Sequence, residues 1–227
     1  MPEPQPFELV IFDCDGVLID SEMISARMLV AALAERGVSI DLPYVAQHFL
    51  GRSYPTVMAT IRRDFGLDLP PAFEEDYRER LLEGFRRELR VMPHVAEVMD
   101  ALGLPYCVAT SSSPRRVEIS LVLTGLWPRV QGRIFTASEV ARGKPAPDLF
   151  LHAAARMGVD PARCLVIEDS LTGIASGLAA GMTVWRFTGG SHMANGYAPE
   201  PPEATPQMHF ASFADFFHLA PDLRGAG

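Results

Sequence analysis

The sequence predicts an α/β fold in which a parallel sheet is interrupted by an all-helical segment, and three observations support this prediction. Residues 9–12 are four consecutive apolar residues, as expected for a strand that is buried on both faces. From residue 93 onward, helical patterns alternate with short apolar runs, which is typical of parallel strands joined by crossover helices. Between these parts, residues 19–91 show helical periodicity and no convincing strand.

Local signals place the helices of the inserted segment. We expect helices over 21–36, 55–65 and 73–89, with a short segment over 43–50 and a loop over 51–54 between the first two. Gly37 and Gly66 follow the first two long helices as C-terminal stops. Aromatic and aliphatic residues recur every four positions along 73–89, and this stripe predicts core packing rather than a ligand site.

The second part of the chain alternates strands and helices. Apolar runs predict strands over 106–109, 134–135, 164–167 and 183–187. Helices are expected over 95–102, after the Ser113 cap, between Asp148 and Gly158, and after residue 170. Gly173, Gly177 and Gly181 lie four apart in the last of these helices and predict close packing of that helix on the sheet. A loop over 189–206 and a closing helix over 212–219 follow.

Composition narrows the function classes. The formal net charge is −8 and the basic residues are scattered, which argues against a nucleic-acid partner. The three cysteines fit no zinc motif and are expected to be free buried thiols in a reducing compartment. The start is proline-rich rather than a signal peptide, and no apolar run is long enough to span a membrane. We therefore expect a cytoplasmic monomer without a membrane or nucleic-acid partner.

Polar residues follow several of the predicted strands. They are Asp13 and Asp15 after the first strand, Thr110 and Ser111 after the second, Lys144 in a proline-rich loop, and Glu168 and Asp169 after the fourth. Because ligands bind at the carboxyl ends of parallel strands, we expect these groups to meet at one edge. Taken singly, the aspartates could be ordinary turn residues and Lys144 a surface lysine. As a set they predict a site for phosphate and metal.

The charges of these residues imply a cation. Four carboxylates cannot all stay ionised side by side without positive charge nearby. Carboxylate oxygens suit Mg²⁺, and Lys144 is the single lysine of the chain. The ion and Lys144 would supply about three positive charges and could face a phosphate.

Four stretches of the chain resemble the motifs of the haloacid dehalogenase-like superfamily. They are Phe12-Asp13-Cys14-Asp15-Gly16-Val17, Ala109-Thr110-Ser111, Gly143-Lys144-Pro145 and Val166-Ile167-Glu168-Asp169-Ser170. The run from residue 13 to residue 22 is similar to the branch of sugar-phosphate phosphatases and β-phosphoglucomutases. That resemblance implies a Rossmann-like catalytic core of residues 1–18 and 92–227, and a helical cap over 19–91 that selects the substrate.

The resemblance also implies catalytic roles. Asp13 would attack phosphorus and become the aspartyl phosphate, while Asp15 would protonate the leaving oxygen and later deprotonate water. Ser111 or Thr110, together with Lys144, would contact the phosphoryl oxygens; the choice between the two hydroxyls is left open.

For the metal, the resemblance implies Mg²⁺ held by the Asp13 carboxylate, the backbone carbonyl of Asp15 and the Asp169 carboxylate. Glu168 would be either a direct ligand or a supporting neighbour of Asp169, and both possibilities stay open.

Within the family, the residues favour a phosphatase. Dehalogenating members lack the second aspartate of the first motif, which here is Asp15, and phosphonate hydrolysis needs a cap lysine that residues 19–91 do not contain. Mutases of the family carry a histidine where this chain has Ser25 and an arginine where it has Tyr54. A β-phosphoglucomutase-like transfer and a non-catalytic phosphate-binding regulator remain the alternatives.

The cap supplies the candidates for substrate contact. Arg52 and Ser53, with Arg27 and Tyr54, are expected to face the sugar, and Arg52 would suit an anionic or hydroxylated tail; a solvated surface arginine is the competing interpretation. The chain most resembles phosphatases that act on phosphorylated sugars and sugar acids such as 6-phosphogluconate. His192 is interpreted as an ordinary loop residue.

Overall fold

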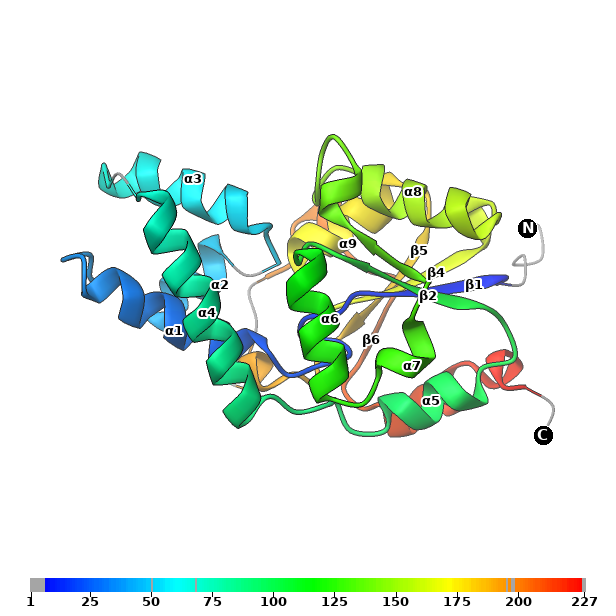
Figure 1. Cartoon of the computed structure of the whole chain (residues 1–227). Helices are drawn as coiled ribbons and strands as arrows, with labels where there is room; N and C mark the ends of the chain where they lie inside the picture. Colours follow the sequence, from blue (N-terminus) through cyan, green and yellow to red (C-terminus); the bar gives the residue numbers. More distant parts are fainter. Residues whose placement is uncertain (1–6, 50, 68, 195, 197–198, 226–227) are drawn as a thin grey trace.

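A sheet of parallel strands forms the centre of the molecule. The computed structural model describes residues 7–225 except 50, 68, 195, 197 and 198, so the proline-rich start over residues 1–6 lies outside it. Within the described residues, six strands lie in the order β3-β2-β1-β4-β5-β6, and every neighbouring pair is parallel (Figure 1). The predicted α/β fold with a parallel sheet is therefore confirmed.

The strands are short, and their order defines a crevice. Their bounds are β1 (Leu9–Phe12), β2 (Tyr106–Thr110), β3 (Ile134–Thr136), β4 (Cys164–Glu168), β5 (Thr183–Phe187) and β6 (Met208–Phe210). The chain builds outward from β1 to β3 and then returns to the other side of β1 at β4. Ligands bind at such a reversal point, outside the carboxyl ends of the strands. The crevice between β1 and β4 is thus the expected ligand site.

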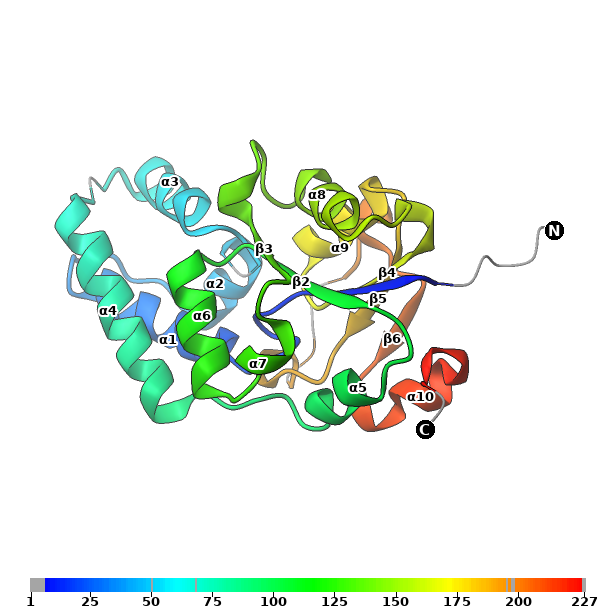
Figure 2. The ribbon, with the colours of Figure 1, turned by 45° about the vertical axis from the view of Figure 1, so that its right-hand side comes forward.

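Both faces of the sheet are covered by helices. Leu9 and Ile11 belong to a core shared with α8 (Asp148–Met157) and α9 (Leu171–Ala179). Val10 and Phe12 point to the other core, which includes α5 (Val95–Ala101), α6 (Pro114–Leu123), α7 (Trp127–Val130) and α10 (Phe216–Leu219). Figure 2 shows α8 and α9 on one side of the sheet and α5 and α10 on the other. This alternation explains why the strands are continuous apolar runs.

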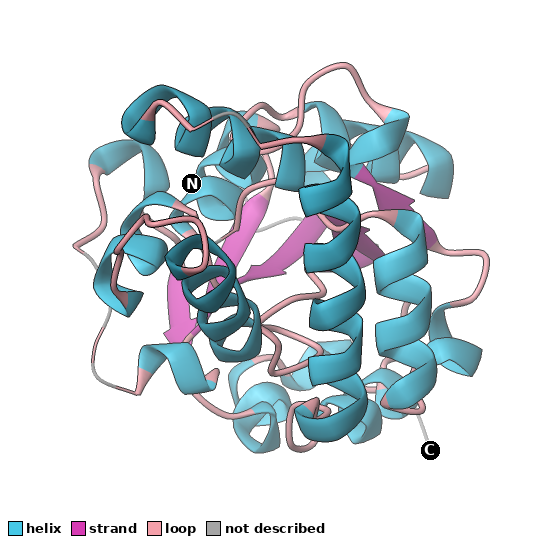
Figure 3. Ribbon diagram, turned by 60° about the vertical axis from the view of Figure 1, so that its left-hand side comes forward, coloured by secondary structure: helices cyan, strands magenta, loops and turns pink. Residues whose placement is uncertain are grey.

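Of the described helices between β1 and β2, the first four form an insertion beside the sheet. They are α1 (Glu22–Ala34), α2 (Leu42–His48), α3 (Tyr54–Phe65) and α4 (Pro71–Glu88). They lie beside the end of the sheet to which β1 points, and a view from that side shows them in front of the strands (Figures 1 and 3). These are the helices that the sequence predicted, within one or two residues at each end; residue 50 of the predicted 43–50 segment lies outside the described residues.

The two linkers of this insertion pair with each other. The Asp20 amide donates to the Arg90 carbonyl at 2.9 Å, and the Met92 amide donates to the Leu18 carbonyl at 2.9 Å. Ile19 and Val91 form the antiparallel bridge between them. The chain therefore enters and leaves the helical insertion through one two-stranded connection.

Strand β6 was not predicted from the sequence. It has only three residues, its central His209 is exposed, and it follows a proline-rich loop, so it shows no apolar run. Pairing with β5 and packing of the Phe210 ring against Phe187, with centroids 5.2 Å apart, account for the strand. Tertiary contact rather than local pattern specifies it.

The three cysteines are buried and free, as expected. Among the described residues, the helices are all too short or too polar to cross a membrane.

The glycines of α9 allow that helix to lie close to the sheet. A Cβ at Gly177 would come within 2.7 Å of Val184 Cγ2, and a Cβ at Gly173 within 1.6 Å of Glu168 Oε1. Gly181 follows the helix with φ +75° and has no atom within 4 Å of such a Cβ. The predicted close packing is therefore a property of Gly173 and Gly177, whereas Gly181 supplies a left-handed turn.

We predict that Gly177→Val destabilises the protein by about 1–3 kcal/mol, the usual cost of over-packing a filled interface. Urea unfolding would measure it. Ala179→Val is the matched control, because it adds the same side chain at an exposed position of α9 and should change stability by less than about 0.5 kcal/mol. A loss in Gly177→Val no larger than that in Ala179→Val would contradict over-packing against β5, because helix propensity alone favours valine over glycine.

Candidate active site

The site begins where β1 and β4 end side by side. Phe12 pairs with Ile167 in the sheet, and the Asp13 amide donates to the Ile167 carbonyl at 2.9 Å. Asp13 and Asp169 therefore leave neighbouring strands at the same edge. Gly16, with φ +78°, turns the chain there, and a Cβ on it would lie 2.1 Å from Asp169 Oδ2. Only glycine permits both this backbone conformation and this close approach.

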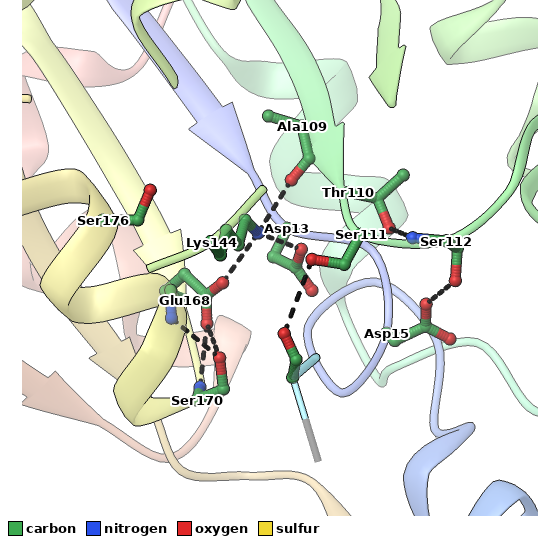
Figure 4. Close-up of polar contacts among 12 residues, drawn as sticks. Asp13, Asp15, Ala109, Thr110, Ser111, Ser112, Lys144, Glu168, Ser170 and Ser176 are labelled. Atoms are coloured by element: carbon green, nitrogen blue, oxygen red, sulfur yellow. Dashed lines mark hydrogen bonds and ion pairs between the residues drawn. The ribbon is translucent and has the colours of Figure 1, made fainter. Parts of the chain in front are cut away.

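Lys144 is buried among acceptors at this edge. Its Nζ donates to Asp13 Oδ1 at 2.6 Å, to Glu168 Oε1 at 2.8 Å and to the Ala109 carbonyl at 3.0 Å (Figure 4). Burial disfavours the charged amine, but the two carboxylates outweigh it and hold the pKa of Lys144 above its usual value. The lysine is therefore a fixed cation.

Three carboxylates can supply a metal site. Asp13, Glu168 and Asp169 each offer an oxygen, and the three oxygens lie within 4.8 Å of one another. Burial raises the pKa of both Asp13 and Asp169; neighbouring carboxylates raise it further, and the Lys144 charge opposes the rise without cancelling it. A divalent cation would relieve this repulsion, and an all-oxygen donor set suits a hard ion. The residues present thus fit a divalent metal.

Glu168 is already engaged through both oxygens. Oε1 accepts from Lys144, and Oε2 accepts from the amides of Asp169 and Ser170, each at 2.8 Å, and from the Ser170 hydroxyl. Gly173 leaves the space for this carboxylate. The contacts fix Glu168 beside Asp169, in the arrangement expected of a supporting neighbour.

The Asp15 carboxylate is held apart from the other three carboxylates, those of Asp13, Glu168 and Asp169. Its oxygens accept from Ser21 Oγ at 2.6 Å, Ser112 Oγ at 2.5 Å and Arg116 Nη2 at 2.6 Å. Burial raises its pKa, but the Arg116 charge and the hydroxyl donors outweigh burial and leave the pKa below its usual value. In Figure 4 it lies on the Ser112 side of Asp13, away from Glu168. Metal contact through its backbone carbonyl stays a prediction.

The hydroxyls at the end of β2, on Thr110 and Ser111, have different partners. Thr110 is buried, and its Oγ1 accepts from the Ser112 amide at 3.1 Å. Ser111 Oγ donates to the Gly51 carbonyl at 3.4 Å, across to the helical insertion. Both border the site cavity, so the choice between them stays open.

Sequence reasoning missed Arg116 and Ser112. Ser113 caps α6 by accepting from the Arg116 amide at 3.4 Å, which places that arginine in the first turn of the helix. Its guanidinium reaches Asp15 and Ser25 Oγ, the latter at 3.2 Å. The cap at Ser113 is visible in the sequence. The contact of Arg116 with a residue 101 positions away is not.

His192 and Glu22 also lie closer to the site than expected. His192 Nε2 lies 2.9 Å from Asp169 Oδ2, so this histidine is more than the ordinary loop residue expected from the sequence. Burial, together with the charges of Asp15 and Asp169, raises the pKa of Glu22 to about 8. The buried Cys14 thiol has its pKa raised by burial and two aspartates, which disfavours a nucleophilic role.

A cavity of about 430 Å³ extends from Asp13 and Asp15 into the helical insertion. Arg52 and Tyr54, two of the predicted substrate contacts, border it. Ser53 instead shares a hydrogen bond with Thr56 Oγ1 at 2.9 Å. Arg27 pairs with Glu88 on the exposed surface. The structure therefore brings Arg52 and Tyr54 to the cavity, and leaves Ser53 and Arg27 outside its wall.

A parallel sheet with buried carboxylates and a lysine at its switch point defines a class of hydrolytic α/β enzymes, and comparison identifies the family. A family model described as haloacid dehalogenase-like hydrolase matches residues 7–181. The chain belongs to this family, as the sequence motifs predicted.

Individual relatives agree with this assignment. The chain is 30% identical to 6-phosphogluconate phosphatase of Escherichia coli K12, over 82% of this chain and 84% of that protein. It is also 30% identical to fructose-1-phosphate phosphatase YqaB of the same organism, over 76% and 92% of the two chains. A HAD family hydrolase from Deinococcus radiodurans R1, solved with bound phosphate and sodium, is 34% identical with a TM-score of 0.73, covering 97% and 99%.

We predict that Mg²⁺ raises the melting temperature and that Asp169→Asn abolishes most of this gain. An ion that binds only the folded state stabilises it, by about 2.7 kcal/mol at 100 times its Kd. Thermal unfolding with and without MgCl₂ measures the effect. Glu203→Gln, at an exposed position, should keep the full gain. An undiminished gain in Asp169→Asn would place the ion elsewhere.

Proposed function

We propose that this protein is a Mg²⁺-dependent phosphatase that hydrolyses a small phosphorylated sugar or sugar acid through an aspartyl-phosphate intermediate. The observation that carries the proposal is the position of Asp13, which is bound to Lys144 and lies within the three-carboxylate group. The prediction of a phosphoric monoester hydrolase is confirmed by the family match and by the phosphatase relatives.

Asp13 would act as the nucleophile. One of its oxygens attacks phosphorus, the bond from phosphorus to the leaving oxygen breaks, and the aspartyl phosphate forms. Asp13 must be ionised to attack, although burial raises its pKa. The Lys144 amine at 2.6 Å favours the ionised form. Lys144 and the hydroxyl of Thr110 or Ser111 would also stabilise charge on the phosphoryl oxygens.

The Asp13 and Asp169 carboxylates and the Asp15 backbone carbonyl would hold Mg²⁺, with Glu168 as neighbour or ligand. When bound, the ion supplies positive charge for the phosphoryl oxygens. His192 and Glu168 would keep Asp169 oriented, since each lies next to it.

Asp15 would act first as the general acid and then as the general base. It donates a proton to the leaving oxygen, then takes one from the water that attacks the aspartyl phosphate, which releases phosphate and restores Asp13. The donors from Ser21, Ser112 and Arg116 favour its ionised form, which is the form that accepts the water proton. The geometry therefore suits the second, hydrolytic step best.

Residues 19–91 would form a cap on a core of residues 1–18 and 92–227. The paired linkers give one connection between the two parts, and the Gly51 loop reaches the strand ends. Closure of the cap over the substrate would exclude water from the cavity. Arg52 at the cavity would bind an anionic or hydroxylated tail, in keeping with the sugar-acid phosphate that names one relative.

The mutase alternative has less support. Ser25, at the position of the mutase histidine, donates to the Ser21 carbonyl and accepts from Arg116. A hydroxyl in these contacts offers no proton-transfer group of suitable pKa for a sugar acceptor.

We predict that the protein releases inorganic phosphate, with Mg²⁺, from one or a few members of a panel of sugar phosphates and sugar-acid phosphates. Asp13→Asn should lower the rate by more than about 10³-fold, because the nucleophile is lost. Release from no member would favour the alternatives, and β-glucose 1-phosphate should then be examined for conversion to glucose 6-phosphate.

The same panel tests Arg52. Arg52→Ala should lower kcat/KM for 6-phosphogluconate more than for glucose 6-phosphate, because only the former adds a carboxylate. An unchanged ratio would remove Arg52 as the anion-binding residue.

We predict that Arg116→Ala moves the acidic limb of the kcat–pH profile to higher pH. Arg116 lowers the pKa of Asp15, so its removal raises that pKa, and Asp15 then becomes a base only at higher pH. Saturating p-nitrophenyl phosphate is the suitable substrate, because its leaving group needs no proton and water attack then limits the rate.

Arg116→Lys should restore part of the shift by returning a positive charge. Arg129→Ala removes an arginine that pairs with Asp100, and should leave the profile unchanged. A lower kcat in Arg116→Ala with an unmoved limb would mean that Arg116 only supports the fold.

A further inference from the structure

The leaving group of the substrate has to occupy the cavity on the cap side of the strand ends. Asp15 would protonate the leaving oxygen, so that oxygen lies on the Asp15 side of phosphorus. On the opposite side of Asp13, Lys144 contacts both Asp13 and Glu168, and these contacts close that side to the leaving group. From Asp15 the cavity of about 430 Å³ continues between the helices of the insertion. Its volume lies in the usual range of small-molecule sites, roughly 300–1,000 Å³.

The wall of this cap half is mainly apolar. Leu29, Phe49, Met58 and Leu81 come from or follow four different helices, and all border the cavity while being almost completely buried. Apolar side chains on several sides favour a ligand surface that is itself apolar.

Aromatic rings form part of the same wall. Tyr54 and Tyr77 stack with centroids 5.6 Å apart and planes 18° apart. Stacked rings at a cavity wall favour a ligand surface that is itself aromatic.

Polar groups on the cap side are few. Glu22, Ser25, Arg52 and Arg78 are the charged or hydroxyl-bearing cap side chains, apart from the tyrosines, at the cavity wall. Arg52 and Arg78 are exposed, so they lie toward solvent rather than at the inner end. A bare polyol pushed into the inner part would leave several hydroxyls without partners, which costs binding energy.

We propose that the substrate is a phosphorylated sugar that carries an aromatic ring, with the ring seated in the apolar half of the cavity. This inference rests on the proposed phosphatase function and narrows its substrate class. The phosphate would lie at Asp13, the sugar beside Asp15 and Ser25, and the ring between Leu29, Phe49 and the tyrosine pair.

The experiment compares esters that share one phosphorylated sugar and differ in the ring. Ribose 5-phosphate is the bare member, and uridine and adenosine 5′-monophosphate carry rings. KM comes from Mg²⁺-dependent phosphate release, and Kd from calorimetry on Asp13→Asn, which binds without turnover. We expect KM and Kd for at least one ring-bearing ester to be lower by about tenfold or more, as apolar burial of a ring implies.

A substitution that partly fills the apolar half of the cavity tests the ring site directly. Ala26→Leu, on the cavity wall, should weaken binding of the ring-bearing ester by about tenfold and leave ribose 5-phosphate unchanged. If Ala26→Leu does not fold, Val57→Leu is the alternative, because Val57 borders the same cavity from α3. It should likewise weaken binding of the ring-bearing ester and leave binding of ribose 5-phosphate unchanged. Ala31→Leu, at an exposed position of α1, is the control.

The outcomes separate the two proposals. Release of phosphate from ribose 5-phosphate, with equal or weaker binding of both ring-bearing esters, would overturn the aromatic substrate and leave the phosphatase intact. Tighter binding of a ring-bearing ester to Asp13→Asn, without phosphate release by the natural chain from any ester, would overturn the phosphatase and keep the ring site. If Ala26→Leu or Val57→Leu weakens binding of ribose 5-phosphate and of the ring-bearing esters equally, the ring site is also overturned.

Discussion

The rest of the structure depends on keeping three buried carboxylates and one buried lysine together at the ends of parallel strands. Asp13, Glu168 and Asp169 with Lys144 carry two net negative charges when all are ionised. Burial of such a group costs more than its internal attractions return, unless further charge is supplied. A divalent cation would make the group neutral, and a phosphate could then approach the ion and the lysine together. We therefore expect this group of charges to contribute to ion binding rather than to stability.

This constraint explains where the backbone has to come close. Gly16 and Gly173 leave the space that the Asp169 and Glu168 carboxylates occupy, because any side chain at either position would overlap those oxygens. Gly51 does the same for the insertion, since a Cβ there would lie 2.5 Å from Ser170 Cβ. Its carbonyl accepts from Ser111 and Thr172, so the insertion touches the strand ends that hold the carboxylates. Glycines in the sheet region and in the insertion thus allow both parts of the chain to approach the carboxylates at the strand ends.

Features that depend on local sequence pattern were predicted from the sequence. Features that depend on contacts between distant residues were missed. The apolar runs, and the meeting of Asp13 with Asp169, were predictable because parallel strands put their carboxyl ends at one edge. Lys144 lies in a loop and was predicted from its motif and as the single lysine of the chain. Strand β6 was missed because three residues give no periodicity, and Arg116 because its partner lies far away in sequence. Ser53 was predicted as a substrate contact from its place in a loop, but its hydroxyl shares a hydrogen bond with Thr56 in the first turn of α3. Contacts across the cavity depend on helix orientation, which periodicity does not specify.

The two ends of the cavity pose separate chemical problems, and the chain solves them with separate residues. At one end, the charged side chains of Asp13, Glu168, Asp169 and Lys144 lie at or near the strand ends, where the sheet fixes their geometry. The other end is lined mainly by apolar side chains of the inserted helices, and many different sequences can form such a wall. Relatives named for a sugar acid phosphate and for a ketose phosphate match this chain at the same 30% identity. Family membership therefore identifies a phosphoric monoester hydrolase, and we expect the side chains of α1 to α4 to select the substrate.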